Sequence, residues 1–436
     1  MKWKVYPEYK NTGFEWGKVP DHWDIKRNDS VLRITRENAS TEWMSGQNVF
    51  HYSIPSVQEI NDGQFDEGDN IDSSKTLITQ TVLLVSKLNP RKGTIAVAYP
   101  RDVPTVCSSE FVSLAPFRCN VHYAEYVYKS EYVRQYLSST VESATRSHQR
   151  ANPEEIRKIW WAWPPLDEQR TISSFLDNET ARIGALVTKK ERQIELLQEK
   201  LAALSSHTVT KGLNLNVRMK DSVIEWLGEI PEHWEVKRLK YITPKVTVGI
   251  VITPSKYYVD EGIPCLRSLN VRENQLAETD LVYISSDSNE MHSKSKISKG
   301  DLVAVRTGQP GTTAVVDDRF DGANCIDLII IHRSRSYDSH FLCYVMNSHY
   351  AKSQYLSGST GAIQAHFNIE TASNMVITVP SYEDQVHIRE YLDRESKGIS
   401  GLIRKIECSI ERLHEYRTAL ISATVTGKID VRQEVA

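Results

Sequence analysis

The sequence predicts an α+β protein in which two β-rich domains are separated by two long helices that pair as an antiparallel coiled coil. Three observations lead to this prediction. The segment from Pro164 to Asn214 returns from Pro380 to Asp430 at a constant offset of 216 residues (380 − 164). Both copies carry apolar residues at heptad spacing. Each copy also follows a region of short β-branched runs separated by turns, so we expect a tandem repeat with an approximate two-fold axis.

The apolar residues of each copy step by four and three positions, as in a helix that packs along another helix. A lone helix would leave this stripe in water, and the other copy is the best partner in the chain. The alternative is two amphipathic helices that each cover an ordinary core, but one pattern repeated in one register favours pairing. Each seam has one basic interruption, Lys190 or Arg417. The expected seam consists of Ile183, Val187, Ile194, Leu197, Leu201 and Leu204 with Ile399, Ile403, Ile406, Ile410, Leu413 and Leu420.

A second repeated segment precedes each β-rich region. Residues 15–27 return as residues 225–238, and each copy has a proline, a His-Trp pair and a further tryptophan. We interpret this segment as a packed lead-in, and for His22 and His233 a structural role is favoured over a chemical one. The expected anchors are Trp16, Trp23, Trp226 and Trp234.

Each β-rich region is expected to contain three strands, with a turn bearing Pro and Gly between the first two. A helix-like stretch, a polar loop and a short strand then lead into the long helix. The expected strands are residues 81–88, 94–99 and 105–114 in the first region and 301–306, 312–316 and 325–332 in the second. The helix-like stretches are 123–137 and 341–356, and the polar loops are 143–152 and 358–368; residues 153–158 are expected to start a strand or turn.

The composition is that of a globular protein whose 436 residues require more than one domain. The chain starts without an apolar segment of signal-peptide length and has no run long enough to cross a membrane, so we expect a cytoplasmic protein with no membrane partner. Six cysteines without CxxC or zinc spacing favour free buried thiols. A net charge of −3 argues against a general nucleic-acid coat protein but leaves sequence-specific DNA binding open.

Several short motifs together resemble the DNA specificity subunit of type I restriction-modification enzymes. They are Pro-Leu-Asp-Glu-Gln at 165–169, Ile-x-x-x-Leu-Asp at 172–177, the heptad helix, Trp-Leu-Gly-x-Ile-Pro-x-His-Trp at 226–234 and Val-Thr-Gly-Lys-Ile-Asp at 425–430. The resemblance covers essentially the full chain. The departures are modest: the first half has Glu-Trp-Gly-Lys where the second has Glu-Trp-Leu-Gly, and it ends Thr-Lys-Gly instead of Thr-Gly-Lys.

This resemblance implies a non-catalytic subunit in which each of two target-recognition domains, 1–163 and 215–379, reads one half of an asymmetric bipartite site in double-stranded DNA. The spacer helix regions, 164–214 and 380–436, set the gap. It also implies assembly with two methyltransferase subunits and with restriction/translocase subunits. S-adenosylmethionine, ATP and Mg are then cofactors of those partners, and none is expected on this chain or bound as a metal.

The helix length suits such a role. Residues 180–207 predict a helix of about 42 Å at ~1.5 Å per residue. This length is comparable with the ~34 Å between half-sites one DNA turn apart. If the helices pair antiparallel, two unlike domains can face one duplex across a gap of unread base pairs.

Residues that can read base edges concentrate in the expected turns and polar loops. Arg, Lys, Gln, Thr and His side chains offer the hydrogen-bonding groups that such reading needs. The alternative for any one of them is a solvated loop residue or a phosphate contact, since phosphates receive half or more of protein–DNA hydrogen bonds. The candidates are Arg91, Lys92, Arg146, His148, Gln149 and Arg150 in the first domain and Arg306, Thr307, Gln309, Gln364 and His366 in the second.

Catalytic motifs are not found. The Asn-Pro pairs at 89–90 and 152–153 continue as Arg and Glu, unlike the Asn/Asp-Pro-Pro-Tyr/Phe run of adenine methyltransferases, and there is no phosphate loop or His-Glu-x-x-His helix. The alternative functions are a coiled-coil protein-interaction scaffold without sequence-specific DNA binding and, less favoured, a self-sufficient nuclease or methyltransferase. The first would show no sequence-dependent retention of DNA, and the second would modify or cut DNA when purified alone.

Overall fold

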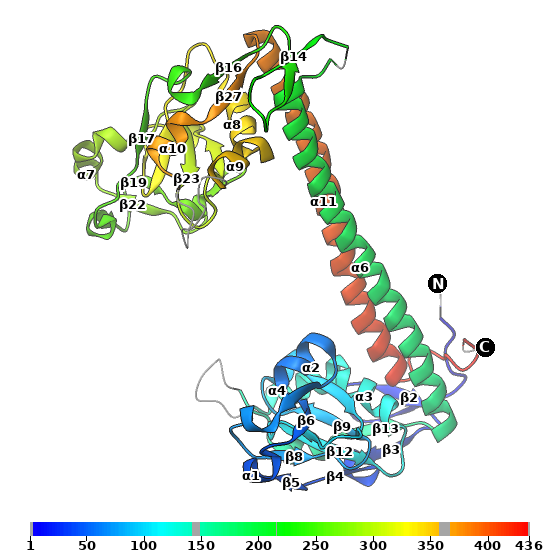
Figure 1. Ribbon diagram of the computed structural model, residues 1–436. Coiled ribbons are helices and arrows are strands. Elements are labelled where there is room, and N and C mark those ends of the chain that lie inside the picture. The colour runs from blue at the N-terminus through cyan, green and yellow to red at the C-terminus, as the bar shows by residue number, and fades with distance from the viewer. Residues whose placement is uncertain (1–2, 142–148, 215, 357–366, 435–436) are drawn as a thin grey trace. The chain divides into compact units, whose positions relative to one another are not determined.

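The chain folds into two compact units, each of which combines a β-rich domain with parts of two long helices (Figure 1). The structure is a computed structural model that describes residues 3–141, 149–214, 216–356 and 367–434. Unit 1 contains residues 1–190 and 407–436, and unit 2 contains residues 191–406. The predicted α+β class and the duplication are therefore confirmed.

The β-rich domain of unit 1 is built on a four-stranded antiparallel sheet in the order β10-β9-β12-β4. A second sheet has the order β5-β8-β11-β6-β7, in which β11 is parallel to β6. Strand pairs β1-β2 and β3-β13 complete the domain. The strands are β1 Tyr9–Asn11, β2 Lys18–Pro20, β3 Asp24–Arg27, β4 Leu32–Ile34, β5 Asn38–Ala39, β6 Asn48–Tyr52, β7 Gln64–Glu67, β8 Lys75–Leu77, β9 Val82–Ser86, β10 Ile95–Ala98, β11 Thr105–Cys107, β12 Phe111–Pro116 and β13 Trp160–Trp163.

Unit 2 repeats this plan, with differences at the sheet edges. Its first sheet, β24-β23-β26-β17, has the equivalent order, and the pair β19-β25 is parallel like β6-β11. The second sheet of unit 2 has the order β18-β22-β19-β25, and its outer strand β18 has no counterpart in unit 1. The second sheet of unit 1 is instead extended at its opposite edge, by β8 and β5 next to β11. The strands are β14 Met219–Asp221, β15 Glu229–Pro231, β16 Glu235–Arg238, β17 Val246–Val248, β18 Tyr258–Val259, β19 Ile263–Leu266, β20 Val271–Arg272, β21 Gln275–Leu276, β22 Val282–Ile284, β23 Leu302–Val305, β24 Thr313–Val315, β25 Asn324–Cys325, β26 Leu328–Ile331 and β27 Val376–Val379.

The third expected strand of each region is in fact two strands that join different sheets. Residues 105–114 divide into β11 and β12, and residues 325–332 divide into β25 and β26. The break in the second domain is at Asp327, whose φ of 51° lies in the left-handed region that few side chains adopt. The chain needs such a turn to pass from one sheet to the other. A continuous run of apolar residues in the sequence does not predict where this turn lies.

Each helix-like stretch is two short helices separated by a serine. In unit 1 these are α3 Val121–Lys129 and α4 Glu131–Ser139, and in unit 2 they are α8 Ser339–Asn347 and α9 His349–Leu356. Ser130 has extended backbone, and its hydroxyl accepts a hydrogen bond from the Val133 N–H, so it ends one helix and caps the next. Residues 153–157 form a helix, α5 Pro153–Arg157, because Asn152 caps it; the expected strand or turn start is wrong there. The remaining helices are α1 Thr41–Met44, α2 Ile54–Ile60, α7 Ser286–Met291 and α10 Ile369–Asn374.

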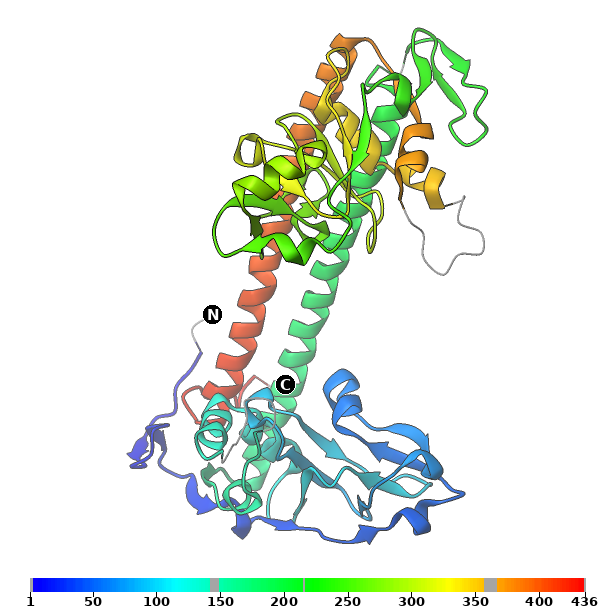
Figure 2. The ribbon, with the colours of Figure 1, turned by 90° about the vertical axis from the view of Figure 1, so that its left-hand side faces the viewer.

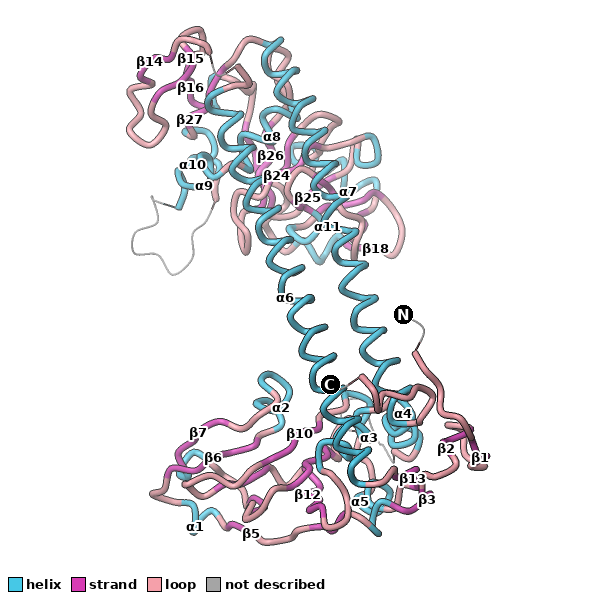
Figure 3. Tube along the Cα trace, turned by 90° about the vertical axis from the view of Figure 1, so that its right-hand side faces the viewer, coloured by secondary structure: helices cyan, strands magenta, loops and turns pink. Residues whose placement is uncertain are grey.

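The two long helices are α6 Leu166–Lys211 and α11 Tyr382–Val425, and they lie side by side in all three views (Figures 1, 2 and 3). Unit 1 contains the start of α6 and the end of α11, whereas unit 2 contains the end of α6 and the start of α11. The helices are therefore antiparallel, as predicted. Both helices are longer than the range 180–207 predicted for the first of them, since α6 has 46 residues and α11 has 44.

The expected seam residues are less exposed than their neighbours on the same helices. Ile183, Val187, Ile399 and Leu420 are buried, and the other eight are half-buried. Leu186, Leu196 and Leu402, which lie outside the seam pattern, are 36%, 48% and 49% exposed. Helix pairing of this kind buries a narrow stripe only, as a two-helix contact without further layers should.

The lead-in segments pack as expected except at one tryptophan. Trp16, Trp23 and Trp234 are buried, but Trp226 is 51% exposed. Its ring contacts the Tyr350 ring, with 5.3 Å between the ring centroids. Trp16 instead packs against Trp161, which lies on the β13 strand of the same unit. The equivalent strand of domain 2 is β27, which has Ile377 at the position of Trp161 and contains no tryptophan. Trp226 therefore has no indole to pack against, and the prediction that it is a buried anchor is wrong.

Candidate nucleic-acid interface

The turn between β9 and β10 and the end of the polar loop lie together in unit 1. The Asn89 N–H donates to the Gln149 carbonyl at 2.8 Å, and the Ala151 N–H donates to the Lys87 carbonyl at 2.9 Å. Leu88 and Arg150 form an isolated β-bridge between these hydrogen bonds. The two stretches, more than fifty residues apart in sequence, thus form one surface at this end of the sheet, which we call the reading end of domain 1.

The reading end of domain 1 carries exposed basic side chains. Arg91 and Lys92 lie in the short 3-10 turn Pro90–Lys92, and both are exposed. Gly93 follows with a φ of 62°, and a side chain there would strain the backbone and approach Arg134 of α4. Gln149 is half-buried and meets the turn through its backbone. Arg146 and His148 lie outside the described residues.

Unit 2 brings the equivalent segments together. The Phe367 N–H donates to the Arg306 carbonyl at 3.2 Å, so the end of the second polar loop meets the residue that follows β23. Thr307 is half-buried and Gln309 is exposed in the turn that follows. We call this surface, with Arg306, Thr307 and Gln309, the reading end of domain 2. Gln364 and His366 lie outside the described residues.

An arginine is paired with a carboxylate at each reading end. In domain 1 Arg150 donates from Nε and Nη2 to the two oxygens of Glu110, at 3.1 and 2.9 Å. In domain 2 Arg306 donates from Nη1 to Asp327 Oδ1 at 2.7 Å, and the Thr307 hydroxyl donates to Oδ2 at 3.3 Å. The sequence analysis did not select Glu110 or Asp327, and no motif marks either residue. Their position directly before β12 and β26 could have drawn attention to them.

A basic cavity adjoins the reading end of domain 1. Its volume is about 690 Å³, and it is lined by α2, by the β9–β10 turn and by α11. Lys92, Lys129 and Arg417 contribute positive charge, although Lys129 is already paired with Glu125 at 2.6 Å. Arg417, which the heptad pattern treats as an interruption of the seam, is exposed and faces this cavity.

Replacing Lys92 or Arg417 by Ala should weaken binding to all DNA sequences alike, because an exposed cation beside a reading surface serves as a phosphate contact. Each loss should reduce the slope of log affinity against log salt by about 0.9. The measurement is a salt titration of binding to a fixed duplex. Arg170→Ala, which removes an exposed arginine paired with Asp167, is the matched control and should leave the slope unchanged. A change in sequence preference in the Lys92 or Arg417 variants would contradict a phosphate role.

Each β-rich domain is fastened to both long helices by matched contacts. The Gln169 carboxamide at the start of α6 accepts from the Asn120 N–H and donates to the Pro164 carbonyl, both at 2.8 Å. Gln385 makes the same pair of bonds with Asp338 and Pro380, at 2.8 and 3.1 Å. About two turns further on, Tyr126 donates to Asp177 and Tyr344 donates to Asp393, each at 2.7 Å. These contacts fix the angle between each sheet and its own helix.

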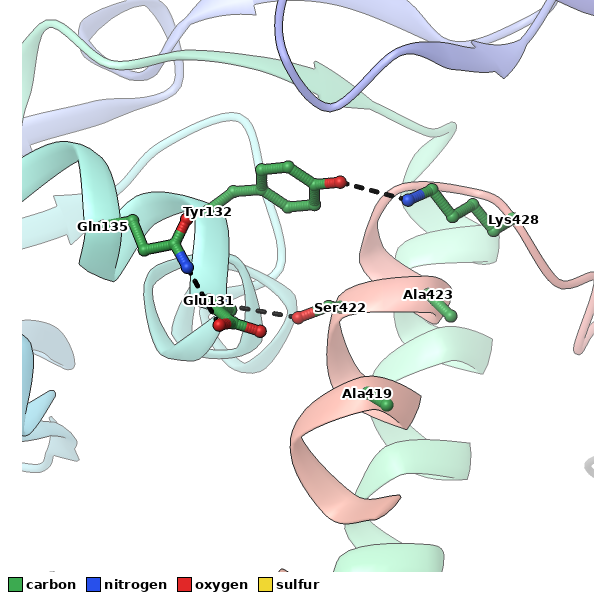
Figure 4. Close-up of a pocket in the computed structure, with 7 residues that line it drawn as sticks. All are labelled: Glu131, Tyr132, Gln135, Ala419, Ser422, Ala423 and Lys428. Carbon is green, nitrogen blue, oxygen red and sulfur yellow. Dashed lines mark hydrogen bonds between the residues drawn. The ribbon is translucent and has the colours of Figure 1, made fainter. Parts of the chain in front are cut away.

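The end of the other helix docks on the same domain. In unit 1 the Glu131 N–H donates to the Ser422 hydroxyl of α11, and Lys428 donates to the Tyr132 hydroxyl, around a cavity of about 350 Å³ (Figure 4). In unit 2 the His349 N–H donates to the Ser206 hydroxyl of α6 at 3.0 Å. Ser206 and Ser422 are one repeat apart, so each domain holds the start of one helix and the end of the other.

The lead-in histidines serve these junctions. His22 Nε2 lies 2.7 Å from Glu168, which also accepts from the Tyr6 hydroxyl and Trp23 Nε1. His233 lies 3.2 Å from Asp384 in the second copy. Both histidines therefore tie the lead-in to the first turn of a long helix, in agreement with a structural role.

The described residues show no metal site, and the buried thiols are disfavoured as nucleophiles. Within them, no cluster of three or more His, Cys, Asp or Glu side chains could hold a metal ion. Burial raises the pKa of Cys107 and of Cys265 to about 12, so neither is a ready nucleophile. Four of the six cysteines are buried and free, as expected, but Cys119 is half-buried and Cys408 is exposed on α11. None of the helices in the described part of the chain is long and apolar enough to cross a membrane.

Comparisons with known proteins agree with this architecture. The chain is 22% identical over 426 residues to the type I restriction enzyme MjaVIII specificity subunit of Methanocaldococcus jannaschii, with 95% of each chain covered. It is 22% identical over 450 residues to the putative MjaX specificity subunit of the same organism, with 97% and 98% covered, and 21% identical over 275 residues to the EcoBI specificity subunit of Escherichia coli, with 61% and 57% covered. No family model matches the chain.

The fold is similar to solved structures. A chain from a study of assembly and conformational transition in the type I R-M system aligns with a TM-score of 0.74 at 16% identity, covering 94% of this chain and 99% of that one. The HsdS subunit from Thermoanaerobacter tengcongensis aligns with a TM-score of 0.52 at 17% identity, covering 94% and 98%. Along nearly its whole length the chain is similar in sequence to specificity subunits of type I restriction-modification systems, and it shares the fold of the solved HsdS subunit.

Proposed function

We propose that this chain directs a type I restriction-modification complex to an asymmetric, bipartite DNA site. Domain 1 reads one half-site, domain 2 reads the other, and the paired helices α6 and α11 set the gap between them. The observation that supports this most strongly is the duplication itself: one plan appears twice, yet the side chains at the two reading ends differ. Readers that differ imply half-sites that differ.

The reading ends have the chemistry for this role. Each has exposed or half-buried side chains with basic or amide groups where a turn meets the end of a loop, and base-edge contacts in a major groove require such groups. The candidates for base-edge contacts in this arrangement are Arg91, Gln149 and Arg150 in domain 1 and Arg306, Thr307 and Gln309 in domain 2. Lys92, beside them, is the candidate for a phosphate contact. The net charge of −3 is consistent with local positive surfaces instead of a uniformly basic protein.

The chemistry then belongs to partners. Methyltransferase subunits would supply S-adenosylmethionine-dependent methylation, and restriction/translocase subunits would supply ATP- and Mg-dependent cleavage. The contacts that fasten each domain to two helices support a rigid spacer on which such partners can assemble.

The test is to express the chain with its methyltransferase subunit in a host that lacks DNA methylation and to map methylated adenines in the genome. We expect a single motif with two unlike halves separated by a fixed number of unspecified base pairs. Omitting this chain should abolish the methylation. A complex that forms but methylates without sequence preference would instead favour the protein-interaction scaffold.

A further inference from the structure

We infer that Glu110 and Asp327 are positioning residues that hold Arg150 and Arg306 as guanine readers, one at each reading end. The inference rests on the proposed function and deepens it, because it assigns a guanine to each half-site and names the carboxylates on which its recognition depends.

The geometry of the Arg150 pair is the first support. Arg150 uses Nε and Nη2 to grip both oxygens of Glu110, which is a side-on bidentate pair. A guanidinium has five N–H donors, so this pair leaves the end-on edge, with one donor on Nη1 and one on Nη2, free to make two parallel hydrogen bonds. The Arg150 side chain is 61% exposed, and this edge meets no other acceptor among the described residues. Two parallel donors match O6 and N7 of guanine in the major groove.

Arg306 shows the complementary arrangement. Among the described residues it donates to Asp327 from Nη1 alone, which leaves the side-on edge, Nε with Nη2, as the free fork. Asp327 is itself held by the Thr307 hydroxyl, and its backbone N–H donates to the Ile250 carbonyl at 3.1 Å. The Arg306 side chain is 32% exposed and the Asp327 side chain is 33% exposed, so the free fork can reach a ligand while Nη1 stays paired with the carboxylate.

The two carboxylates occupy equivalent places, although their arginines do not. Glu110 directly precedes β12 and Asp327 directly precedes β26, the matching strands of the two sheets. Arg150 comes from the end of the polar loop, whereas Arg306 directly follows β23. A carboxylate at the same place in the fold thus holds an arginine in both domains, but the arginine comes from a different segment. This difference is expected if the two arginines approach their base pairs from different directions.

Stability does not account for these pairs. The two carboxylates are 26% and 33% exposed, and a solvent-accessible Arg–carboxylate pair contributes little to folding because solvent screens it. A carboxylate beside a docked polyanion also repels it, which lowers affinity for every DNA sequence. A positioning role accounts for its presence, because an arginine held in one orientation loses less side-chain freedom on binding and aims its fork at one base.

The test compares three variants of the domain 1 pair, namely Glu110→Gln, Glu110→Asp and Arg150→Lys. The control is Asp62→Asn, which breaks the exposed Arg101–Asp62 pair near the opposite end of β10. Each full-length variant, assembled with the methyltransferase subunits, selects duplexes from a random pool, and its affinity for a non-selected duplex is measured in parallel. For domain 2 the variants are Asp327→Asn and, as control, Glu278→Gln, which breaks an exposed pair with Arg319.

Glu110→Gln should lower guanine preference at one position of one half-site about tenfold, in line with the discrimination of a bidentate pair. Affinity for the non-selected duplex should stay equal or rise, and the other half-site should be unchanged. Arg150→Lys should lose preference at the same position, Glu110→Asp should retain part of it, and Asp62→Asn should retain all of it. Asp327→Asn should act in the same way on the other half-site.

The inference is overturned if Glu110→Gln weakens binding to all duplexes equally, or if the position that Arg150 controls is an A·T pair. It is also overturned if Glu110→Gln and Glu110→Asp both lower the melting temperature, since the pair would then be structural. A wild-type complex that selects no bipartite motif would contradict the proposed function. A bipartite motif that is insensitive to Glu110 and Asp327 would contradict this inference alone.

Discussion

Inserting one heptad into each long helix, between Lys190 and Glu191 and between Ile406 and Glu407, should abolish recognition of the natural target. Seven residues keep the seam in register but lengthen each helix by about 10 Å at ~1.5 Å per residue. This length corresponds to about three base pairs of a duplex that rises ~34 Å per turn. The two domains could then not engage their half-sites together, and avidity worth about 10²-fold or more would be lost.

The measurement is binding to a series of duplexes that carry the natural half-sites with gaps lengthened one base pair at a time. Affinity for the natural gap should fall at least about 100-fold, and the preferred gap should be longer. Arg192→Ala is the matched control: it breaks exposed ion pairs with Glu195 and Glu199 without changing helix length, and it should keep the natural gap. An insertion variant that is folded and still prefers the natural gap would show that the helices do not set the spacing.

Replacing Gln385 by Leu should destabilise the second domain by about 2–4 kcal/mol. The Gln385 side chain is 1% exposed and satisfies two backbone groups, the Asp338 N–H and the Pro380 carbonyl. A leucine leaves both without a partner, and each buried unsatisfied group costs about 1–3 kcal/mol. The free energy of unfolding in denaturant, followed by a probe in the second domain, measures the loss.

Two further variants make this result specific. Gln169→Leu should cost the first domain a similar amount, because Gln169 makes the equivalent bonds. Gln198→Leu alters an exposed glutamine in the middle of α6 and should change stability by no more than about 0.5 kcal/mol. Equal effects of Gln385→Leu and Gln198→Leu would mean that the buried carboxamide is not a structural clamp.

Much of the candidate site could be located, though not assembled, from sequence. The turn residues Arg91 and Lys92 and the loop residues Gln149 and Arg150 were selected because they carry suitable donors between periodic segments. Their meeting at one surface depends on hydrogen bonds between residues 87–89 and 149–151, which no local pattern encodes. Glu110 escaped selection for the same reason, since its partner is forty residues away.

Trp226 illustrates the opposite error. The repeat pattern treats it as the copy of Trp16 and predicts a buried anchor, yet burial depends on what the rest of the fold supplies. Trp161 covers Trp16 in the first domain, and the matching strand of the second domain has no comparable aromatic side chain. Internal repetition predicts the same backbone more reliably than the same side-chain environment.

The sequence by itself determined the duplicated plan and the two long helices, because heptad periodicity is local and a 216-residue offset repeats it in register, and it favoured their antiparallel pairing. The tertiary structure alone decided that one apolar run divides between two sheets, that β11 lies parallel to β6, and that Glu110 and Asp327 each grip an arginine. Strand order and ion pairs arise from contacts between distant residues, whose free energy depends on the folded neighbourhood and not on the spacing of residues along the chain.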